Sequence, residues 1–182
     1  IEYYKGIFTT LSSCASRQLE EVTFRRATIS VPELMATAGK YFRKVYKGNK
    51  AHIDFKIQLL EGRITGDWNQ LRFLLENLID EACSVTLDGA VCLSAREDGE
   101  FIRFLFTDMR REKTREELNQ LFYPDLSRMT AGEKGELYGT EYLVCKQIIR
   151  DHDEFAGRRG CRINAEPGKE GGFTIYFTLP KK

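Results

Sequence analysis

The segment Asp67-Trp68-Asn69-Gln70-Leu71-Arg72-Phe73-Leu74-Leu75-Glu76-Asn77-Leu78-Ile79-Asp80-Glu81-Ala82 combines a regular apolar stripe with an acidic, polar edge. At about 100° per residue, its aliphatic side chains share one face of a helix, and Asn77 and Glu81 border that face one turn apart. Asp67, with Gln70 three residues later, predicts an N-cap with a capping box. Two interpretations stay open for this segment alone: a core helix with solvated acids, or a helix whose polar edge faces a binding site.

The C-terminal segments favour the second interpretation. The stretch Gly139-Thr140-Glu141-Tyr142-Leu143-Val144-Cys145-Lys146-Gln147-Ile148-Ile149-Arg150-Asp151-His152 is followed by Glu166-Pro167-Gly168-Lys169 and, at the end, by Thr178-Leu179-Pro180. This order resembles the end of a histidine-kinase ATP-binding domain. In that family a Gly-Leu-Gly-Leu turn opens a helix with a Lys-Gln-Ile-Val-Glu-Ala-His-like end, which two strands, a Glu-Pro-Gly-Lys turn and a Thr-Leu-Pro ending follow.

Three upstream segments keep the order and spacing of the same family. Residues 67–82 match its asparagine box, residues 104–108 resemble the strand that delivers the adenine-binding aspartate, and residues 116–124 resemble its phenylalanine box. The resemblance covers residues 28–180. It implies an α/β (α+β) two-layer sandwich, a Bergerat-type ATPase fold in which helices cover one face of a mixed β-sheet. The helices that begin at Asp67 and Thr140 are expected on the same face.

Hydrophobic periodicity and turn residues give a matching set of expected elements. These are helices at 6–24, 32–46, 67–82, 114–121 and 140–151, strands at 27–31, 52–59 and 63–66, a hairpin of 90–96 with 101–108, and a closing pair of strands. The segment 1–26 precedes the core pattern, so we predict two parts: 1–26 as a helical remnant of a dimerisation hairpin, and 27–182 as the ATP-binding domain.

The resemblance implies that Asp108 accepts a hydrogen bond from the adenine amino group. An acid at a strand end also occurs in ordinary turns, so both interpretations stay open. Asp108-Met109-Arg110-Arg111-Glu112 stands where the family has Asp-x-Gly-x-Gly. Because glycine permits conformations and close approaches that a Cβ forbids, Arg110 and Glu112 are expected to change the shape of an adenine pocket.

Asn77 matches the leading asparagine of its box, whereas Glu81 occupies the position of a magnesium-binding asparagine. Magnesium takes hard oxygen ligands, so the Glu81 carboxylate can replace the amide as a metal ligand. Without the metal, the same carboxylate would repel a triphosphate. ATP and Mg²⁺ are therefore the implied cofactors, and binding is expected to be weak and magnesium-dependent.

The phosphate-binding segments also depart from the family. The second glycine box reads Gly139-Thr140-Glu141, which puts a carboxylate in the first helical turn, where free N–H groups normally receive phosphate. Glu141 either replaces that phosphate or is simply a favourable first-turn acid. Residues 127–135 stand at the place of the ATP lid. There, Arg128 and Lys134 are candidate phosphate contacts or solvated loop charges.

Composition limits the classes of protein and partner. The 182 residues with 42% hydrophobic content can bury one sizeable core, and a formal net charge of +1 argues against a general nucleic-acid surface. Five scattered cysteines without a Cys-x-x-Cys pair favour the cytoplasm over a disulfide framework or a zinc site. No membrane-spanning run or signal peptide is visible. The start at Ile1 indicates a fragment of a longer protein, in which a membrane anchor would lie outside this chain.

The histidines argue against a complete kinase reaction within this chain. Neither His52 nor His152 lies in a His-Glu-x-x-x-Pro setting on a leading helix, so no phosphoacceptor is expected here. His152 is interpreted as a structural residue whose positive charge suits a helix C-terminus. The expected partners are a second copy of the chain through the first helix, a helical hairpin, or a response regulator.

Two functions follow from these expectations. One is the ATP-binding domain of a two-component sensor histidine kinase with weakened or lost nucleotide binding. The other is a non-catalytic pseudokinase module that uses the fold to bind a signalling partner. Retention of Asp108 and Asn77 favours the first function, and loss of the glycines favours the second.

Overall fold

The computed structural model describes residues 24–123, 130–131, 137–138 and 141–182. The elements in these ranges are β1 (Ala27–Ser30), α2 (Val31–Val45), β2 (Ile53–Ile57), β3 (Arg63–Gly66), α3 (Trp68–Cys83), β4 (Gly89–Asp98), β5 (Phe101–Asp108), α4 (Arg115–Gln120), β6 (Thr130–Ala131), β7 (Leu137–Tyr138), α5 (Glu141–Phe155), β8 (Ile163–Pro167) and β9 (Phe173–Pro180). The expected first helix at 6–24 lies outside the described residues. The predicted division of the chain at residue 26 therefore stays a prediction.

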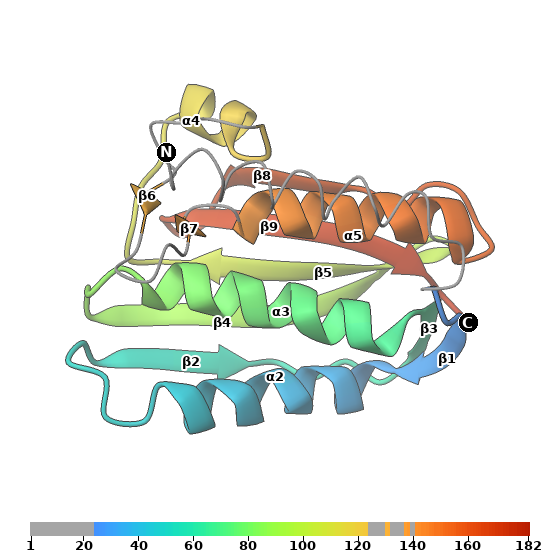
Figure 1. Cartoon of the computed structure of the whole chain (residues 1–182), viewed down its shortest axis with the longest axis horizontal. Helices are drawn as coiled ribbons and strands as arrows, with labels where there is room; N and C mark the ends of the chain where they lie inside the picture. Colours follow the sequence, from blue (N-terminus) through green and yellow to red (C-terminus); the bar gives the residue numbers. More distant parts are fainter. Residues whose placement is uncertain (1–23, 124–129, 132–136, 139–140) are drawn as a thin grey trace.

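A five-stranded mixed sheet in the order β2-β4-β5-β9-β8 forms one layer of the molecule (Figure 1). β2 runs parallel to β4, and the remaining neighbours are antiparallel. Asp98 pairs with Phe101 at the end of the β4–β5 hairpin, so the turn consists of Gly99 and Glu100. Gly99 has a φ of 59°, a conformation that glycine adopts at little cost. The predicted hairpin is confirmed.

Two further pairs of strands lie outside the main sheet. β1 pairs with β3, and β6 pairs with β7, both antiparallel. The sequence pattern predicted β1 and β3 as strands but did not separate them from the main sheet. All four residues of each strand pair with the other strand, from Ala27 with Gly66 to Ser30 with Arg63.

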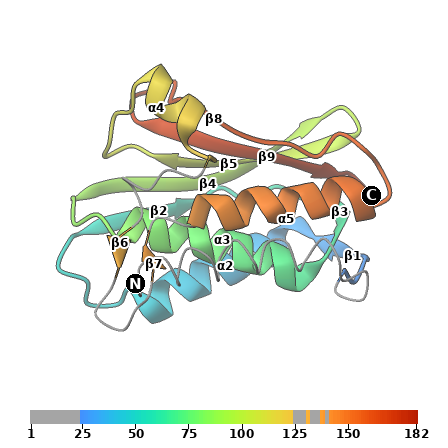
Figure 2. The same cartoon turned by 45° about the horizontal axis from the view of Figure 1, so that its top comes forward.

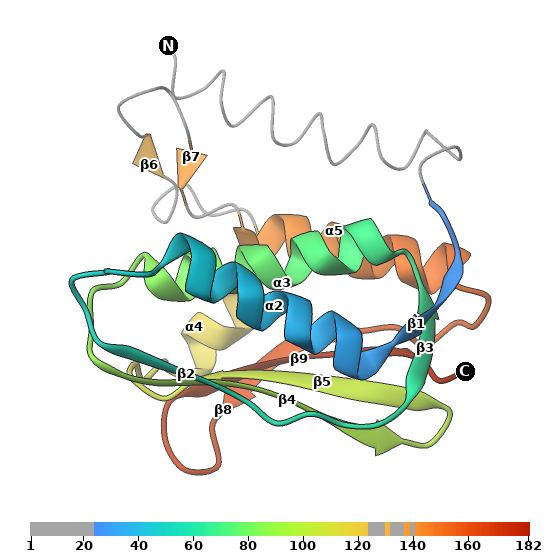
Figure 3. The same ribbon diagram turned by 90° about the horizontal axis from the view of Figure 1, so that it is seen from below.

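Helices α2, α3 and α5 cover one face of the sheet, as the view from below shows (Figure 3). The core fills the space between the layers, where the rings of Phe104 on β5 and Phe177 on β9 stack at 5.0 Å. α4 lies apart from these three helices, beside β8 (Figure 2). The predicted two-layer fold with α3 and α5 on the same face is confirmed.

The N-cap of α3 differs in part from the predicted capping box. The Asp67 carboxylate accepts from the Gln70 backbone N–H at 3.1 Å, as expected. The reciprocal bond is absent among the described residues, because the Asp67 N–H donates to His152 Nε2 at 3.0 Å, and Gln70 Oε1 accepts nothing. The start of α3 is therefore tied to the end of α5.

His152 is structural, but the charge argument behind that prediction is wrong. The ring is fully buried and accepts at Nε2, while Nδ1 donates to the Ile148 carbonyl at 2.8 Å. Burial lowers the pKa of His152 from 6.5 to about 4, although the Ile148 carbonyl and Asp67 act in the opposite direction. The imidazole is therefore neutral near pH 7 and acts through hydrogen bonds.

Candidate functional site

The strand β5 carries Asp108 to the end of the sheet that lies below the C-terminal end of α3. Inward and outward positions alternate along β5, and Asp108 falls on the inward side with only 1% of its side chain exposed. Burial of a carboxylate is costly unless donors surround it. The neighbours of Asp108 therefore determine what it can bind.

The two arginines that follow Asp108 occupy its carboxylate. The backbone N–H and Nε of Arg110 donate to Oδ1 at 3.0 and 2.9 Å, and its second guanidinium nitrogen donates to Oδ2 at 2.9 Å. Arg111 Nε adds a bond to Oδ2 at 3.0 Å. A carboxylate offers about four lone-pair sites. In this arrangement, Asp108 has no acceptor site left for an adenine amino group.

Arg110 is itself fixed beneath the C-terminal end of α3. One guanidinium nitrogen donates to the carbonyls of Val85 and Leu87 at 3.0 and 2.9 Å, and the other also donates to the Ala82 carbonyl. These carbonyls belong to the last turn of the helix and the loop after it, where orphan acceptors need partners. The Arg110 side chain is 1% exposed. It is therefore a fully paired part of the interior.

Gly89 at the start of β4 makes room for this side chain. Its φ is +138°, and a Cβ built there would lie 2.8 Å from Arg110 Cγ. Both the backbone conformation and the contact favour glycine at this position. The sequence showed only a glycine after Asp88, and nothing in its spacing indicated that it serves an arginine 21 positions later.

Arg111 connects Asp108 to Glu81 on α3. Its guanidinium lies 3.5 Å from Glu81 Oε1 and 5.4 Å from the centre of the Phe173 ring. The same Glu81 oxygen accepts from the Tyr142 hydroxyl of α5 at 3.1 Å. Glu81, the predicted metal position, is thus joined to a cation and a hydroxyl group in this structure.

The pKa values agree with this charge pairing. Burial opposes ionisation of Asp108, but the hydrogen bonds of Arg110 and the charges of both arginines outweigh it, so the pKa of Asp108 is lowered. Burial, with the nearby Glu81 carboxylate, raises the pKa of Tyr142 well above its ordinary value. Near neutral pH, Asp108 is therefore ionised and the Tyr142 hydroxyl keeps its proton.

Asn77 lies one turn before Glu81 on α3. Its side-chain amide donates to the Phe73 carbonyl of the same helix at 2.7 Å. The structure thus brings Glu81, Asp108, Arg110 and Arg111 into one network of hydrogen bonds and ion pairs. Among the described residues, the Asn77 amide bonds to the Phe73 carbonyl and not to this network. Arg128, Lys134, Gly139 and Thr140 lie outside the described residues, as does the side chain of Glu141.

Glu112 occupies the second lost glycine position of the Asp108 loop. Its carboxylate accepts from the backbone N–H of Gly172 at 2.7 Å, and so joins the loop after β5 to the start of β9. The prediction that Arg110 and Glu112 reshape this region rested on the loss of glycine. The bonds that they form instead were not visible in the sequence.

Comparison with known proteins identifies the family of this chain. Residues 66–182 match the model described as "Histidine kinase-, DNA gyrase B-, and HSP90-like ATPase". The chain belongs to this ATPase family. The histidine-kinase-like resemblance read from the sequence is thereby confirmed, and the Asp108 network occupies the part of this ATPase domain in which adenine recognition was expected.

Individual relatives agree with the family, and the chain matches only a part of each of them. It is 26% identical over 176 residues to the adaptive-response sensory kinase SasA of Thermosynechococcus vestitus, covering 96% of this chain but 44% of SasA. Full-length ShkA in complex with AMPPNP has a TM-score of 0.71 at 15% identity, covering 99% of this chain and 36% of ShkA. The structure of histidine kinase ThkA in complex with the response regulator TrrA has a TM-score of 0.67 at 17% identity. That match covers 98% of this chain and 49% of ThkA. The chain thus spans less than half the length of each.

Two features of the described residues bear on the metal and membrane expectations. Among them, no group of three or more His, Cys, Asp or Glu side chains is arranged to hold a metal ion. Within the same residues, no helix has both the length and the apolar character needed to cross a membrane.

Proposed function

We propose that this chain is the ATP-binding-type domain of a cytoplasmic two-component sensor kinase in which nucleotide binding is weak or lost. The family match and the SasA likeness support the signalling assignment. The main support for weak or lost binding is that the Arg110 guanidinium donates hydrogen bonds to both carboxylate oxygens of Asp108 and to three backbone carbonyls. Adenine would have to displace this buried, fully bonded cation.

The residues assigned to ATP and magnesium do not fit these cofactors as they are arranged here. Asp108 has no free acceptor site, and Glu81 is paired with Arg111. If Arg110 and Arg111 moved away, Asp108 would recognise adenine and Glu81 would hold magnesium. Asn77, Gly139, Thr140, Arg128 and Lys134 would then contact the nucleotide. Magnesium would then supply charge neutralisation at the triphosphate.

A pseudokinase module that binds a signalling partner is the second candidate function, and the same Arg110 network favours it. Because its own ion pairs fill the site, the domain can keep its fold without a bound nucleotide. The ThkA complex with TrrA supports a response regulator as the partner class for either function. Self-association through residues 1–26 is the other partner proposal.

Calorimetric titration with ATP and AMPPNP, with and without magnesium, tests the proposal. The unmodified chain should bind at best weakly and only with magnesium. Arg110→Gly should strengthen binding, because it removes the guanidinium from Asp108. Met109→Gly is the matched control, since it adds the same backbone freedom one residue away on an exposed side chain and leaves the ion pair in place.

Two further variants separate the phosphate and metal proposals. Glu141→Gly should recover more binding than Glu81→Asn, because Glu81 can still act through magnesium whereas Glu141 has no cation to bridge it to phosphate. Micromolar binding of ATP by the unmodified chain without magnesium would overturn the proposal. Binding that is equally strengthened by Met109→Gly and Arg110→Gly would show that loop stiffness, and not the guanidinium, limits the affinity.

A further inference from the structure

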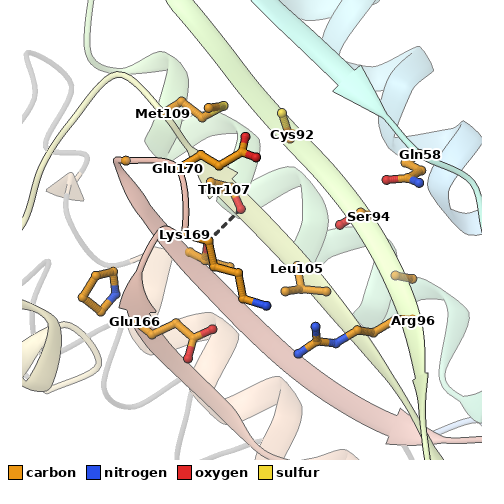
Figure 4. Close-up of a pocket in the computed structure, with 14 residues that line it drawn as sticks. Gln58, Cys92, Ser94, Arg96, Leu105, Thr107, Met109, Glu166, Lys169 and Glu170 are labelled. Carbon is orange, nitrogen blue, oxygen red and sulfur yellow. Dashed lines mark hydrogen bonds between the residues drawn. The ribbon is translucent and has the colours of Figure 1, made fainter.

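A cavity of about 520 Å³ lies on the sheet face opposite α2, α3 and α5. The outward-facing side chains of β4, β5 and β9 form its floor, and the β8–β9 connection forms one wall (Figure 4). This volume falls within the range of small-molecule sites, about 300–1,000 Å³. The Asp108 network is directed toward the helices, so the two sites are separated by the sheet.

The floor offers hydrogen-bonding groups around an apolar centre. Ser94, Thr107 and Thr174 carry hydroxyl groups. Leu105 lies between Thr107 and the end of the cavity that holds Arg96 and Lys169 (Figure 4). The Thr107 and Thr174 hydroxyls lie 2.8 Å apart and share one hydrogen bond. Each hydroxyl can donate once, so the pair retains one unused hydrogen for a ligand acceptor.

The wall is held in place before any ligand arrives. Gly168 N–H donates to the Gly172 carbonyl at 2.9 Å, and Gly172 N–H donates to Glu112 at 2.7 Å. Gly172 has a φ of +70°, and a Cβ there would lie 2.1 Å from the Asp108 carbonyl oxygen. This tight backbone approach fixes the position of Lys169 and Glu170, which project from the same turn.

The charged groups of the cavity are separated along its length. Figure 4 shows the head groups of Arg96 and Lys169 directed toward one another beside Leu105, whereas the Glu170 carboxylate lies at the other end, near Cys92 and Met109. Glu166 on β8 adds a carboxylate at the side. Within the described part of the chain, neither Arg96 nor Lys169 forms an ion pair.

We infer that this cavity binds a small zwitterionic ligand of the short-peptide class. Its carboxylate meets Arg96 and Lys169, its apolar middle lies over Leu105, and its amine meets Glu170. Arg96 and Lys169, which form no ion pair within the described residues, attract an anionic group, and Glu170 at the opposite end rejects a second anion there but favours a cation. The inference stands independently of nucleotide binding, because no residue of the Asp108 ion-pair network lines the cavity.

The test is an NMR titration of the ¹⁵N-labelled chain with the tripeptide Ala-Leu-Ala. We expect saturable shifts of the backbone amides in β4, β5 and the β8–β9 turn. The C-terminally amidated and N-acetylated forms of the same peptide should bind about two- to fivefold more weakly, the range for exposed ion pairs. Arg96→Gln and Lys169→Gln should weaken the unmodified peptide by a similar factor and leave the amidated form unchanged.

Glu170→Gln supplies the reciprocal test. It should weaken peptides with a free amine but not the N-acetylated form. Lys44→Gln, on the solvent side of α2, is the control and should change neither affinity. Absence of saturable shifts in the cavity, or equal affinity for the free and amidated peptides, would overturn the inference. The inference would also be overturned if Glu170→Gln weakened the binding of the free-amine peptide and of the N-acetylated peptide equally.

Discussion

Acidification should destabilise this domain through His152, whose neutral ring joins the end of α5 to the first residue before α3. Nδ1 donates to Ile148 and Nε2 accepts from Asp67, so protonation of Nε2 would break the bond between the two helices. It would also bury a positive charge, with Phe24 packed edge-on against the ring at 4.8 Å. Protonation must therefore be far easier in the unfolded chain.

The sign and size follow from the pKa of His152, which burial lowers from 6.5 to about 4. Between these values the unfolded state binds more protons, so stability is full above about pH 6.5 and is lost as the pH falls toward about 4. The whole shift corresponds to about 3 kcal/mol of unfolding free energy. Between about pH 7 and about pH 5, the expected loss from this residue is about 2 kcal/mol.

Urea unfolding, followed by the fluorescence of Trp68, the single tryptophan, measures this loss. His152→Gln keeps a donor and an acceptor but does not titrate, so its unfolding free energy should depend on pH less steeply by about 2 kcal/mol over that range. Other titrating groups contribute to both proteins and cancel in the comparison. The same pH dependence in both proteins would refute the assignment of His152 as a buried neutral link.

Three further predictions concern the Asp108 ion-pair network and the hydrogen bond between Glu112 and Gly172. Arg110→Met should destabilise the domain by about 3–5 kcal/mol in chemical denaturation, because it leaves the Asp108 carboxylate buried with one partner fewer. The double variant Arg110→Met with Asp108→Asn should be more stable than Arg110→Met alone. Gly89→Ala should lower the free energy of unfolding by about 1–3 kcal/mol. The loss should be smaller in the Arg110→Gly background, where the clash with Arg110 Cγ is absent, and equal losses in the two backgrounds would contradict that contact. Glu112→Ala should cost about 1 kcal/mol and speed amide exchange at Gly172, and unchanged exchange would exclude the bond.

Local sequence signals predicted most of the fold. The apolar stripe of residues 67–82 and the N-cap at Asp67 gave α3, Ser30 with Pro32 gave the start of α2, and the alternation in 101–108 gave β5. These features act over one or two turns or along a single strand, so the chain displays them without its tertiary context. The order of the boxes then gave the layer arrangement through resemblance to a family.

The sequence also identified the positions at which this domain departs from that family, namely Glu81, Arg110, Glu112 and Glu141. It did not show what the new side chains bind. Arg110 could have extended into solvent from its loop, and only the folded chain brings the carbonyls of Ala82, Val85 and Leu87 within reach of it. The loss of a glycine is visible at a single position in the sequence. The groups that the new side chain bonds to are distant in the sequence, so the sequence does not show them.

What the sequence determined by itself is therefore the described helices and strands other than β6 and β7, their inward faces and the identity of the altered site positions. Periodicity and capping are properties of neighbouring residues, so the chain displays them locally. The tertiary structure alone decided that Asp108 is saturated by two arginines, that Gly89 accommodates Arg110, and that His152 is neutral. Each of these depends on burial and on groups far apart in the chain, such as His152 and Asp67, which lie 85 positions apart. Charge state and hydrogen-bond partners follow from that packing, and the packing exists only once the layers have come together.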